Sequence, residues 1–360
     1  MEPIIAPISV DLLKAELTIT KKLRNTNKSN NEIYVLNHHD SPNVMKEIGR
    51  LREEAFRDSG GGSGLSMDID EFDTMEKPYQ QLIVWDPEAE KILGGYRFIY
   101  GNDIKMDEDG KPLLATSHMF KFSEKFIKEY LPYTIELGRS FVAPEYQSSK
   151  AGTKALFALD NLWDGLGALA IERPDMKYFF GKMTMYPEYN REARDLIQHF
   201  LFKHFGDKEG LVTAMDPIVI ETDRAYMDTL LTETDFKKDY KLLNAEVRKR
   251  GVNIPPLVNS YMSLSPTMKM FGGGINHEFS EAEETCILIA FDEIHEAKIE
   301  RHINSFIKEK IENIRERFPL FFENMGDSLQ EMLENRRAAR QERLARRAQR
   351  KEKRKHQNKK

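Results

Sequence analysis

The stretch Glu136-Leu-Gly-Arg-Ser-Phe-Val-Ala-Pro-Glu-Tyr-Gln147 places a carboxylate and a guanidinium three residues apart inside a segment that reads as a buried strand. Residues 133–142 are rich in aromatic and β-branched types, and a proline stops them, which is typical of a strand followed by a break. Glu136 and Arg139 are an odd number of positions apart, so a regular strand points them to opposite faces. A bulge at Gly138 would bring both to one side. The segment predicts either an internal ion pair that neutralises itself or a functional site.

Other charged and aromatic residues follow a fixed order around this segment. Arg52 precedes Phe56 by four positions on an expected helix, an acidic loop ends in Asp70-Glu-Phe-Asp73, and Arg97 follows a Gly-Gly pair on an expected strand. The order of these pieces is more specific than any one of them.

This series, completed by the Glu-x-x-Arg pair, resembles the acyl-carrier-protein-dependent branch of the GNAT acyltransferases. That branch includes the autoinducer (acyl-homoserine lactone) synthases and the ornithine and glycine lipid N-acyltransferases, often labelled hemolysin-like. The resemblance covers residues 45–294. Ile254-Pro-Pro-Leu-Val-Asn-Ser-Tyr261 and Phe271-Gly-Gly-Gly-Ile-Asn276 look like the proline-proline segment and the glycine-bearing turn of the aminolipid enzymes. Because the autoinducer synthases lack that part, the aminolipid branch is favoured.

The resemblance implies an α/β GNAT fold with a mixed central sheet, and the coarse periodicity of the chain agrees with it. We expect strands at residues 80–85, 91–101, 133–142, 177–183 and 285–291, and helices at 44–57, 123–130, 150–172, 188–205 and 234–250. The chain divides into an N-terminal extension (1–40), a GNAT-like acyltransferase domain (41–295), an amphipathic helical extension (296–335) and a basic tail (336–360). The apolar stripe of the extension indicates a packing face or a membrane insert.

The resemblance also implies roles for single residues. Glu136 is the expected catalytic base, because amide formation has to remove a proton from the ammonium group of an amino acid. Asp70 and Asp73 are expected to hold the amine-bearing substrate. Arg97 and Arg139 are expected to pair with its carboxylate or to brace the acidic loop.

The acyl-donor site is expected to include Arg52, Phe56, Gln147, Lys150 and Gly152. Common GNATs have Gln/Arg-x-x-Gly-x-Gly/Ala here, and its backbone N–H groups hold the pyrophosphate of coenzyme A. This chain has Gln147-Ser-Ser-Lys150-Ala-Gly152, and a lysine in place of the first glycine weakens that cradle. A phosphopantetheine arm carries a single phosphodiester and needs less of it. Lys150 either pairs with that phosphate or is solvated.

The expected reaction is therefore transfer of a long acyl chain, 3-hydroxylated or not, from acyl carrier protein to the α-amine of glycine or ornithine. This is the first step of aminolipid synthesis, and a second enzyme would O-acylate the product. No cofactor besides the carrier-protein thioester is expected. Two alternatives stay open: an autoinducer-type synthase that cyclises its product, and a non-catalytic scaffold that acts through the basic tail on membrane or RNA.

Composition limits location and partners. At 360 residues and 40% hydrophobic, the chain can bury a core plus an elaboration. Its one cysteine, Cys286, precludes a disulfide within the chain. The N-terminus lacks a basic start, and no segment reaches about 18 apolar residues, so we expect a cytoplasmic protein. The pair His38-His39 has no nearby third ligand, so no metal site is expected.

The net charge of -5 hides a basic tail. Residues 336–360 carry 13 Lys/Arg against two Glu, whereas the other 335 residues hold 41 basic and 57 acidic side chains. The tail is either a solvated helix that frays or a partner for anionic lipid headgroups, each basic residue near such a surface contributing about 1 kcal/mol. RNA and the acidic carrier protein compete for the same charges, and no DNA binding is expected.

A chain ending at Asn335 should acylate a soluble amine at an almost unchanged rate in detergent, yet bind anionic vesicles weakly. Screening limits the attraction to about 10 Å at 0.1 M salt, so added salt should release the full-length chain and affect the shortened one little. Vesicle co-sedimentation measures both. Equal vesicle binding by the two chains would contradict the membrane interpretation of the tail.

Overall fold

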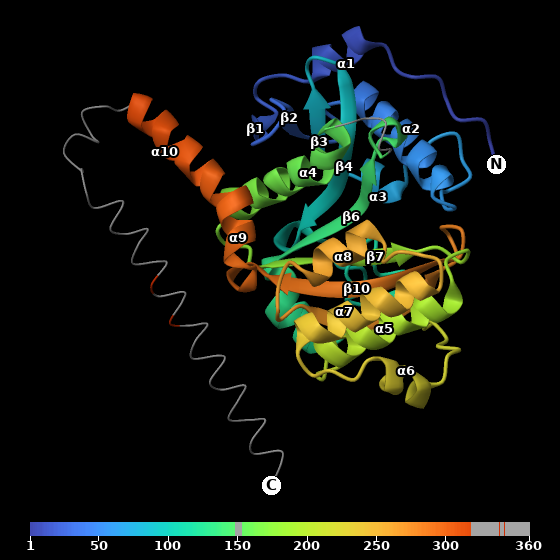
Figure 1. Ribbon diagram of the computed structural model, residues 1–360. Coiled ribbons are helices and arrows are strands. Elements are labelled where there is room, and N and C mark those ends of the chain that lie inside the picture. The colour runs from blue at the N-terminus through green and yellow to red at the C-terminus, as the bar shows by residue number, and fades with distance from the viewer. Residues whose placement is uncertain (148–152, 318–337, 339–341, 343–360) are drawn as a thin grey trace. The chain divides into compact units, whose positions relative to one another are not determined.

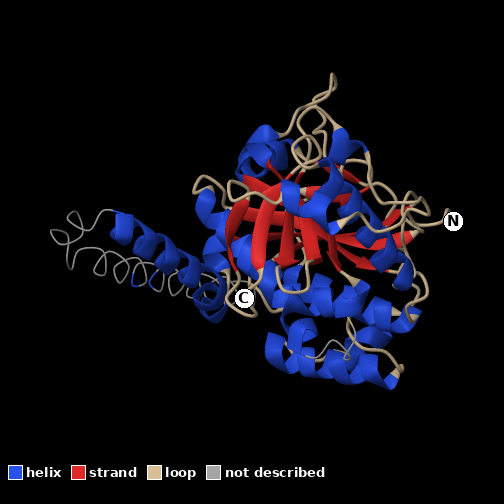
Figure 2. Cartoon of the chain, turned by 90° about the horizontal axis from the view of Figure 1, so that it is seen from above, coloured by secondary structure: helices blue, strands red, loops and turns tan. Residues whose placement is uncertain are grey.

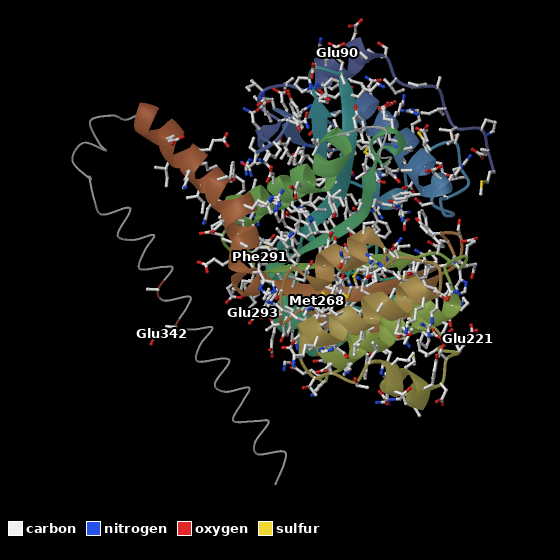
Figure 3. The ribbon with its side chains drawn as sticks, viewed as in Figure 1. Glu90, Glu221, Met268, Phe291, Glu293 and Glu342 are labelled. Carbon is white, nitrogen blue, oxygen red and sulfur yellow. The ribbon has the colours of Figure 1, made fainter. Side chains whose placement is uncertain are left out.

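The computed structural model describes residues 1–147 and 153–317 together with Ala338 and Glu342. The chain divides into two compact units, Met1–Ile303 and Asn304–Lys360. The second unit contains helix α10 (Ser305–Arg317). Glu342, labelled in Figure 3, belongs to the same unit. The helices within the described ranges include none that is both long enough and apolar enough to cross a membrane.

The first unit is built on an eight-stranded sheet in the order β1-β2-β3-β4-β6-β7-β10-β9 (Figure 1). Its strands are β1 (Lys22–Asn25), β2 (Glu32–Leu36), β3 (Gln80–Asp86), β4 (Lys91–Tyr100), β6 (Thr134–Val142), β7 (Tyr178–Met185), β9 (Lys269–Asn276) and β10 (Ala282–Ala290). β6 pairs with β7 in parallel, and the other neighbouring strands described are antiparallel. A short second sheet joins β5 (Phe120–Phe122) to β8 (Val212–Ala214).

Helices surround the sheet, as Figure 2 shows from above. They are α1 (Val10–Glu16), α2 (Pro42–Asp58), α3 (Glu71–Thr74), α4 (Thr153–Glu172), α5 (Arg191–Phe205), α6 (Arg224–Leu230), α7 (Phe236–Lys249), α8 (Pro256–Met262) and α9 (Glu296–Ile299), with a π-helical turn at Phe126–Tyr130. Asn190, Asp223 and Asp235 begin α5, α6 and α7, each accepting a hydrogen bond from a backbone N–H of the first turn. α4 supplies the crossover that the parallel β6–β7 pair requires.

The two faces of the sheet carry different elements. Leu82 of β3 faces α4, because a Cβ atom added at Gly165 of that helix would lie 2.7 Å from Leu82. Gln81, the preceding residue, faces the other way and accepts a hydrogen bond of 2.5 Å from Arg52 of α2. α2 and α3 therefore cover one face, called here the α2 face, and α4 covers the opposite one, the α4 face.

The remaining elements follow the same alternation. Tyr261 of α8 contacts Trp163 of α4 with ring centroids 5.8 Å apart, so α8 lies on the α4 face. The π-helical turn lies on the α2 face, where Phe126 packs on Phe180 of β7 at 5.1 Å. Phe291, labelled in Figure 3, directly follows β10 and packs against Phe179 of β7, with ring centroids 4.4 Å apart.

β6 contains a bulge at Gly138 and Arg139, the feature that brings Glu136 and Arg139 to one face. Arg97 of β4 lies opposite Gly138, whereas Gly95 lies opposite Phe141, so three steps along β6 match two along β4. Arg139 occupies the bulge with φ 46°, a left-handed conformation that residues other than glycine adopt rarely. The extra residue reverses the alternation, which brings Arg139 to the α2 face with Glu136.

The expected strands and helices of residues 41–295 are present, with boundaries shifted by a few residues. Three segments differ from the expectation. β1 and β2, inside the segment set apart as an N-terminal extension, are hydrogen-bonded members of the main sheet. The glycine-bearing segment 271–276 is part of strand β9 and not a turn, with a bulge at Gly272, whose φ is 95°. Residues 296–303 of the expected helical extension belong to the first compact unit.

Gly94→Ala should lower the free energy of unfolding by about 2–3 kcal/mol, because its Cβ atom would lie 2.4 Å from the backbone oxygen of Phe141 and push β4 away from β6. Urea denaturation measures the change. Gly138→Ala is the matched control, since its Cβ atom would meet only the Arg97 side chain at 3.4 Å. Equal losses in the two variants would refute the close approach at Gly94.

Candidate active site

The site lies where β6 and β7 separate. Their pairing joins residues 134–137 of β6 to residues 178–181 of β7 and stops there, although β6 continues to Val142 and β7 to Met185. A cavity of about 400 Å³ opens beyond that point. Glu136 and Leu137 both line it, as do Tyr96 and Arg97, although successive residues of a strand face opposite sides. The cavity therefore reaches through the gap from one face of the sheet to the other.

A row of polar side chains crosses the α2 face of the sheet beside this gap. Each of six neighbouring strands contributes one: Gln81, Arg97, Glu136, Lys182, Glu284 and Asn276, in the order β3, β4, β6, β7, β10 and β9. Most of these side chains are buried. Buried polar groups are retained only with hydrogen bonds or charge partners, so the row needs a network around it.

Glu136 is the carboxylate of this row at the gap, and it is 2% exposed. Thr116 donates a hydrogen bond of 2.7 Å to its Oε1 atom, and the Tyr79 hydroxyl donates a short one to Oε2. Tyr79 in turn accepts a hydrogen bond of 3.0 Å from the backbone N–H of Ala115. Burial raises the pKa of Glu136 above its ordinary value, although the two hydroxyl groups oppose the shift. The site thus holds a carboxylate that takes up a proton more readily than an exposed one.

The acidic loop is tied down by arginines. Asp70 caps α3 by accepting hydrogen bonds from the backbone N–H groups of Phe72 and Asp73, and Asp73 closes the capping box in return. Arg97 pairs with Asp70 at 2.6 Å and with Asp73 at 3.3 Å. Burial raises the pKa of Asp70, but Arg97 and Arg139 outweigh it and lower that pKa to about 2. Asp70 is therefore ionised, and both aspartates are already paired with arginine side chains.

Arg139 completes the same network. Its Nε atom lies 2.9 Å from Asp68, one terminal nitrogen lies 3.6 Å from Asp70, and its guanidinium stacks over Phe279 at 4.6 Å. Of the two roles expected for Arg97 and Arg139, these contacts match bracing of the acidic loop. Both arginines nevertheless line the cavity, whereas Asp70 and Asp73 are absent from its wall.

The expected donor residues fall into three groups. Phe56 and Gln147 line the cavity, and the Gln147 amide donates to the backbone oxygen of Val142 at 2.7 Å. Arg52 is fully buried and does not line the cavity; it pairs with Asp73 at 3.1 Å and so supports the acidic loop from behind. Lys150 and Gly152 lie outside the described residues.

The polar residues on the β7 side of the cavity are not among the site residues that the sequence predicts. Lys182 of β7 and Glu284 of β10 both line the cavity and form an ion pair of 2.5 Å. Lys182 is the one charged residue in the sequence of segment 178–185, and that charge was an available signal. Glu284 was not predicted as a site residue because the expected strand, residues 285–291, begins one residue after it. Tyr79 and Thr116, which hold Glu136, come from loops whose position depends on tertiary packing.

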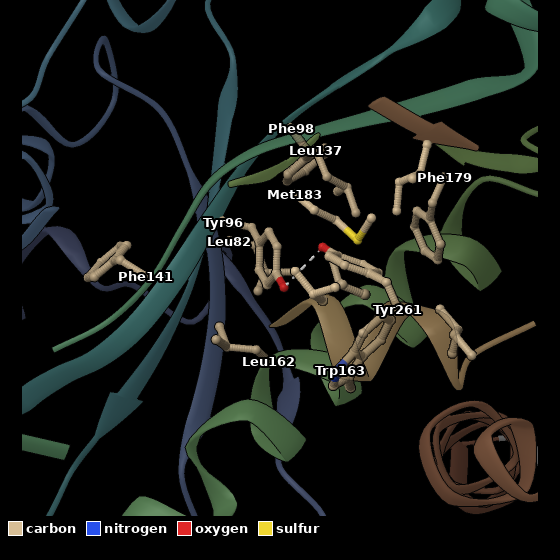
Figure 4. Close-up of a cluster of buried hydrophobic side chains, with 14 of the residues drawn as sticks. Leu82, Tyr96, Phe98, Leu137, Phe141, Leu162, Trp163, Phe179, Met183 and Tyr261 are labelled. Carbon is tan, nitrogen blue, oxygen red and sulfur yellow. Dashed lines mark hydrogen bonds between the residues drawn. The ribbon is translucent and has the colours of Figure 1, made fainter. Parts of the chain in front are cut away.

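The part of the cavity on the α4 face is apolar. Leu159 of α4 and Pro256 and Leu257 of α8 line it, together with Tyr96 and Tyr261. Figure 4 shows the last two pointing toward one another, and their hydroxyl oxygens are 3.4 Å apart. The proline-proline segment singled out in the sequence thus supplies a wall of this apolar arm.

Comparisons with known proteins agree with this architecture. The acetyltransferase (GNAT) domain family matches residues 51–156, a range that includes Glu136 and ends before β7. A protein of Phocaeicola vulgatus named glycine N(alpha)-acyltransferase is 65% identical over 315 residues, covering 88% of this chain and 97% of that protein. A protein of the same name from Bacteroides thetaiotaomicron is 66% identical over 308 residues, covering 86% of this chain and 91% of the relative.

Solved structures of acyl-homoserine lactone synthases are more distant. A coenzyme-A-dependent synthase, BjaI, with bound SAM and isopentyl-CoA, has a TM-score of 0.27 and 13% identity, covering 43% of this chain and 67% of that one. The synthase LasI has a TM-score of 0.25 and 12% identity, covering 42% of this chain and 71% of that one.

The free energy of unfolding of Glu136→Gln should rise relative to that of the wild type as the pH increases from about 4 to about 7. The raised pKa means that the folded state holds the Glu136 proton more tightly than the unfolded state does, so stability from this group is present below its ordinary pKa of 4.5 and is lost as pH rises through the folded value. Glutamine stays neutral throughout. Urea unfolding of both proteins across this range measures the difference, and a gap that is constant with pH would contradict the buried charge.

Proposed function

Because the chain belongs to the glycine N(alpha)-acyltransferase family, we propose that it transfers a long acyl chain from a thioester to the α-amine of glycine, with Glu136 as the proton acceptor. The enzyme is an N-acyltransferase built on a GNAT domain. The observation that carries the assignment of Glu136 is its place: a buried carboxylate with a raised pKa in the wall of the cavity at the gap between β6 and β7.

The chemistry requires one proton acceptor and good positioning. Glycine arrives with a protonated amine, which cannot attack until it loses a proton. Glu136 takes that proton directly or through one water, the neutral nitrogen attacks the thioester carbonyl carbon, and a tetrahedral intermediate forms. The intermediate collapses by breaking its C–S bond, and the sulfur takes up a proton and leaves as a thiol. The nitrogen, positively charged after its attack, loses one proton and becomes the amide nitrogen. A raised pKa brings the carboxylate nearer the pH at which general bases act efficiently.

Positioning comes from the gap itself. β6 beyond Leu137 no longer pairs with β7, so that edge leaves backbone groups for a ligand to bind. One such N–H group would stabilise the negative oxygen of the intermediate, and holding the amine about 3 Å from the carbonyl carbon would supply much of the acceleration. The Thr116 and Tyr79 hydrogen bonds fix the carboxylate for this contact.

The two arms of the cavity support the choice of substrates. The apolar arm on the α4 face, lined by Leu159, Pro256 and Leu257, suits an acyl chain. The polar arm on the α2 face, where Glu136, Lys182 and Glu284 lie, suits a small zwitterion. Glycine is the acceptor in this proposal because the two close relatives carry it in their names.

The donor and the cellular setting belong to the same proposal. The lysine at the phosphate loop favours acyl carrier protein over coenzyme A as donor. The product is an amphiphilic N-acyl amino acid, and binding of the enzyme to a membrane through its basic tail would suit release of that product into the membrane. A 3-hydroxyl group on the acyl chain would then be acylated by a second enzyme, an O-acyltransferase. Ornithine is the alternative acceptor.

Glu136→Gln should keep the fold and slow amide formation by roughly 100-fold or more, the scale expected when a general base is lost. Purified protein, an acyl carrier protein thioester and glycine give the rate, and mass spectrometry identifies a linear amide as opposed to a lactone. A parallel reaction with the matching coenzyme A thioester tests the identity of the donor, and the coenzyme A thioester should react more slowly than the carrier-protein thioester.

Glu108→Gln is the matched control, because Glu108 is exposed and outside the cavity. It should react at the wild-type rate. Wild-type turnover in Glu136→Gln would remove the proposed role of Glu136, and faster reaction with the coenzyme A thioester would remove the carrier-protein proposal.

A further inference from the structure

We infer that Lys182 of β7, held in place by Glu284 of β10, binds the carboxylate of the acceptor amino acid. This inference rests on the proposed function, since it gives the acceptor of that reaction a binding subsite. The ligand class is an α-amino acid whose ammonium group faces Glu136 and whose carboxylate faces the Lys182 ammonium.

The register of the sheet places Lys182 on the same side as the proposed base. Glu136 lies opposite Phe180 in the parallel β6–β7 pair, and Lys182 is two residues further along β7, so both side chains face the α2 face. Lys182 also lies past the last paired residues, where the strands have separated, and it lines the cavity. Its side chain is 11% exposed. A buried ammonium beside a cavity is available to an anion that enters it.

Glu284 has other partners besides Lys182. The amide of Asn276 donates to its Oε2 atom at 3.1 Å, and the hydroxyl of Thr184 donates to Oε1 at 3.2 Å. Burial raises the pKa of Glu284, but the charge and hydrogen bond of Lys182 outweigh it, and the pKa is lowered. Glu284 therefore remains an ionised, hydrogen-bonded anchor when Lys182 also binds a substrate carboxylate. An ammonium has three donors in rotatable positions and can hold two carboxylates at once.

The other cations of the cavity wall are committed elsewhere. Arg97 pairs with Asp70 and Asp73, and Arg139 pairs with Asp68 and Asp70. The fully buried Arg52 also belongs to this group, which therefore contains three arginines in contact with three aspartates. A substrate carboxylate at Arg97 or Arg139 would have to compete with those aspartates.

The distances suit a short amino acid. Glu136 and Lys182 lie on neighbouring strands about 5 Å apart, and Lys182 is a further two residues, about 7 Å, along β7, so their backbones are separated by a diagonal of about 8 Å. The amine and carboxylate of an α-amino acid are about 3 Å apart, and a hydrogen bond of about 3 Å at each end gives a reach of the same order. One α-amino acid can therefore contact Glu136 and Lys182 together.

The test compares glycine with glycinamide, which has the amine but lacks the carboxylate. We expect the wild-type enzyme to prefer glycine in kcat/KM, and Lys182→Gln to lose about 10- to 100-fold of that preference, the scale of one charge-assisted hydrogen bond. Lys182→Arg should recover part of the preference. The loss should appear mainly in KM for glycine, because the contact is made before the amine reacts.

Controls separate this inference from the proposed function. Lys121→Gln alters an exposed lysine of β5 and should keep the full preference. Isothermal titration of glycine into wild type and Lys182→Gln reports binding without turnover, and near-ultraviolet circular dichroism reports folding. A folded Lys182→Gln that keeps the wild-type preference and glycine affinity overturns the subsite and leaves the proposed function standing. A wild-type enzyme that acylates neither amine overturns the proposed function and the inference with it.

Discussion

The end of hydrogen bonding between β6 and β7 is the constraint on which the site depends. After Leu137 and Gly181 the two strands separate, although each continues for several residues. Gly181 marks the point, since a Cβ atom there would lie 2.8 Å from the Leu137 backbone oxygen. Neighbouring strands in a closed sheet leave no room for a ligand. Here the separation creates a cavity, exposes β6 backbone groups to it, and places Glu136 beside it.

Charge is distributed so that Glu136 is held by hydroxyl groups, while Lys182 and Arg97 act on it only through their charge. Arg52, Arg97 and Arg139 form ion pairs with the aspartates of the acidic loop, and breaking such a buried pair is costly because it strands the other charge. Glu136 is instead held by two hydroxyl groups. The arginines therefore fix the loop and the wall of the cavity, while Glu136 keeps the raised pKa that burial gives it.

The parts of the structure that follow from local pattern could be predicted from the sequence, and the parts that depend on register could not. β6 and the strand bearing Arg97 follow from alternation and turn residues, whereas the sequence offered the bulge at Gly138 only as an alternative to a regular strand. The family resemblance implies a glycine-bearing turn at residues 271–276, whereas pairing with β10 holds this segment extended as part of β9. The polar row could not be predicted for a related reason: its members come from six strands, and only the order and register of those strands bring them together.

The cavity through the sheet also bears on how such enzymes diverge. The apolar arm is built from α4 and α8 on one face, and the polar arm from β7 and β10 on the other, so they share few side chains. Substitutions at distant positions with no common partners act nearly independently. Under the proposed function, changes at Leu257 or Tyr261 would alter the preferred acyl chain and leave the amine subsite intact, and changes near Glu284 would do the reverse. A lineage with that division of roles could exchange one half of its product while conserving the other.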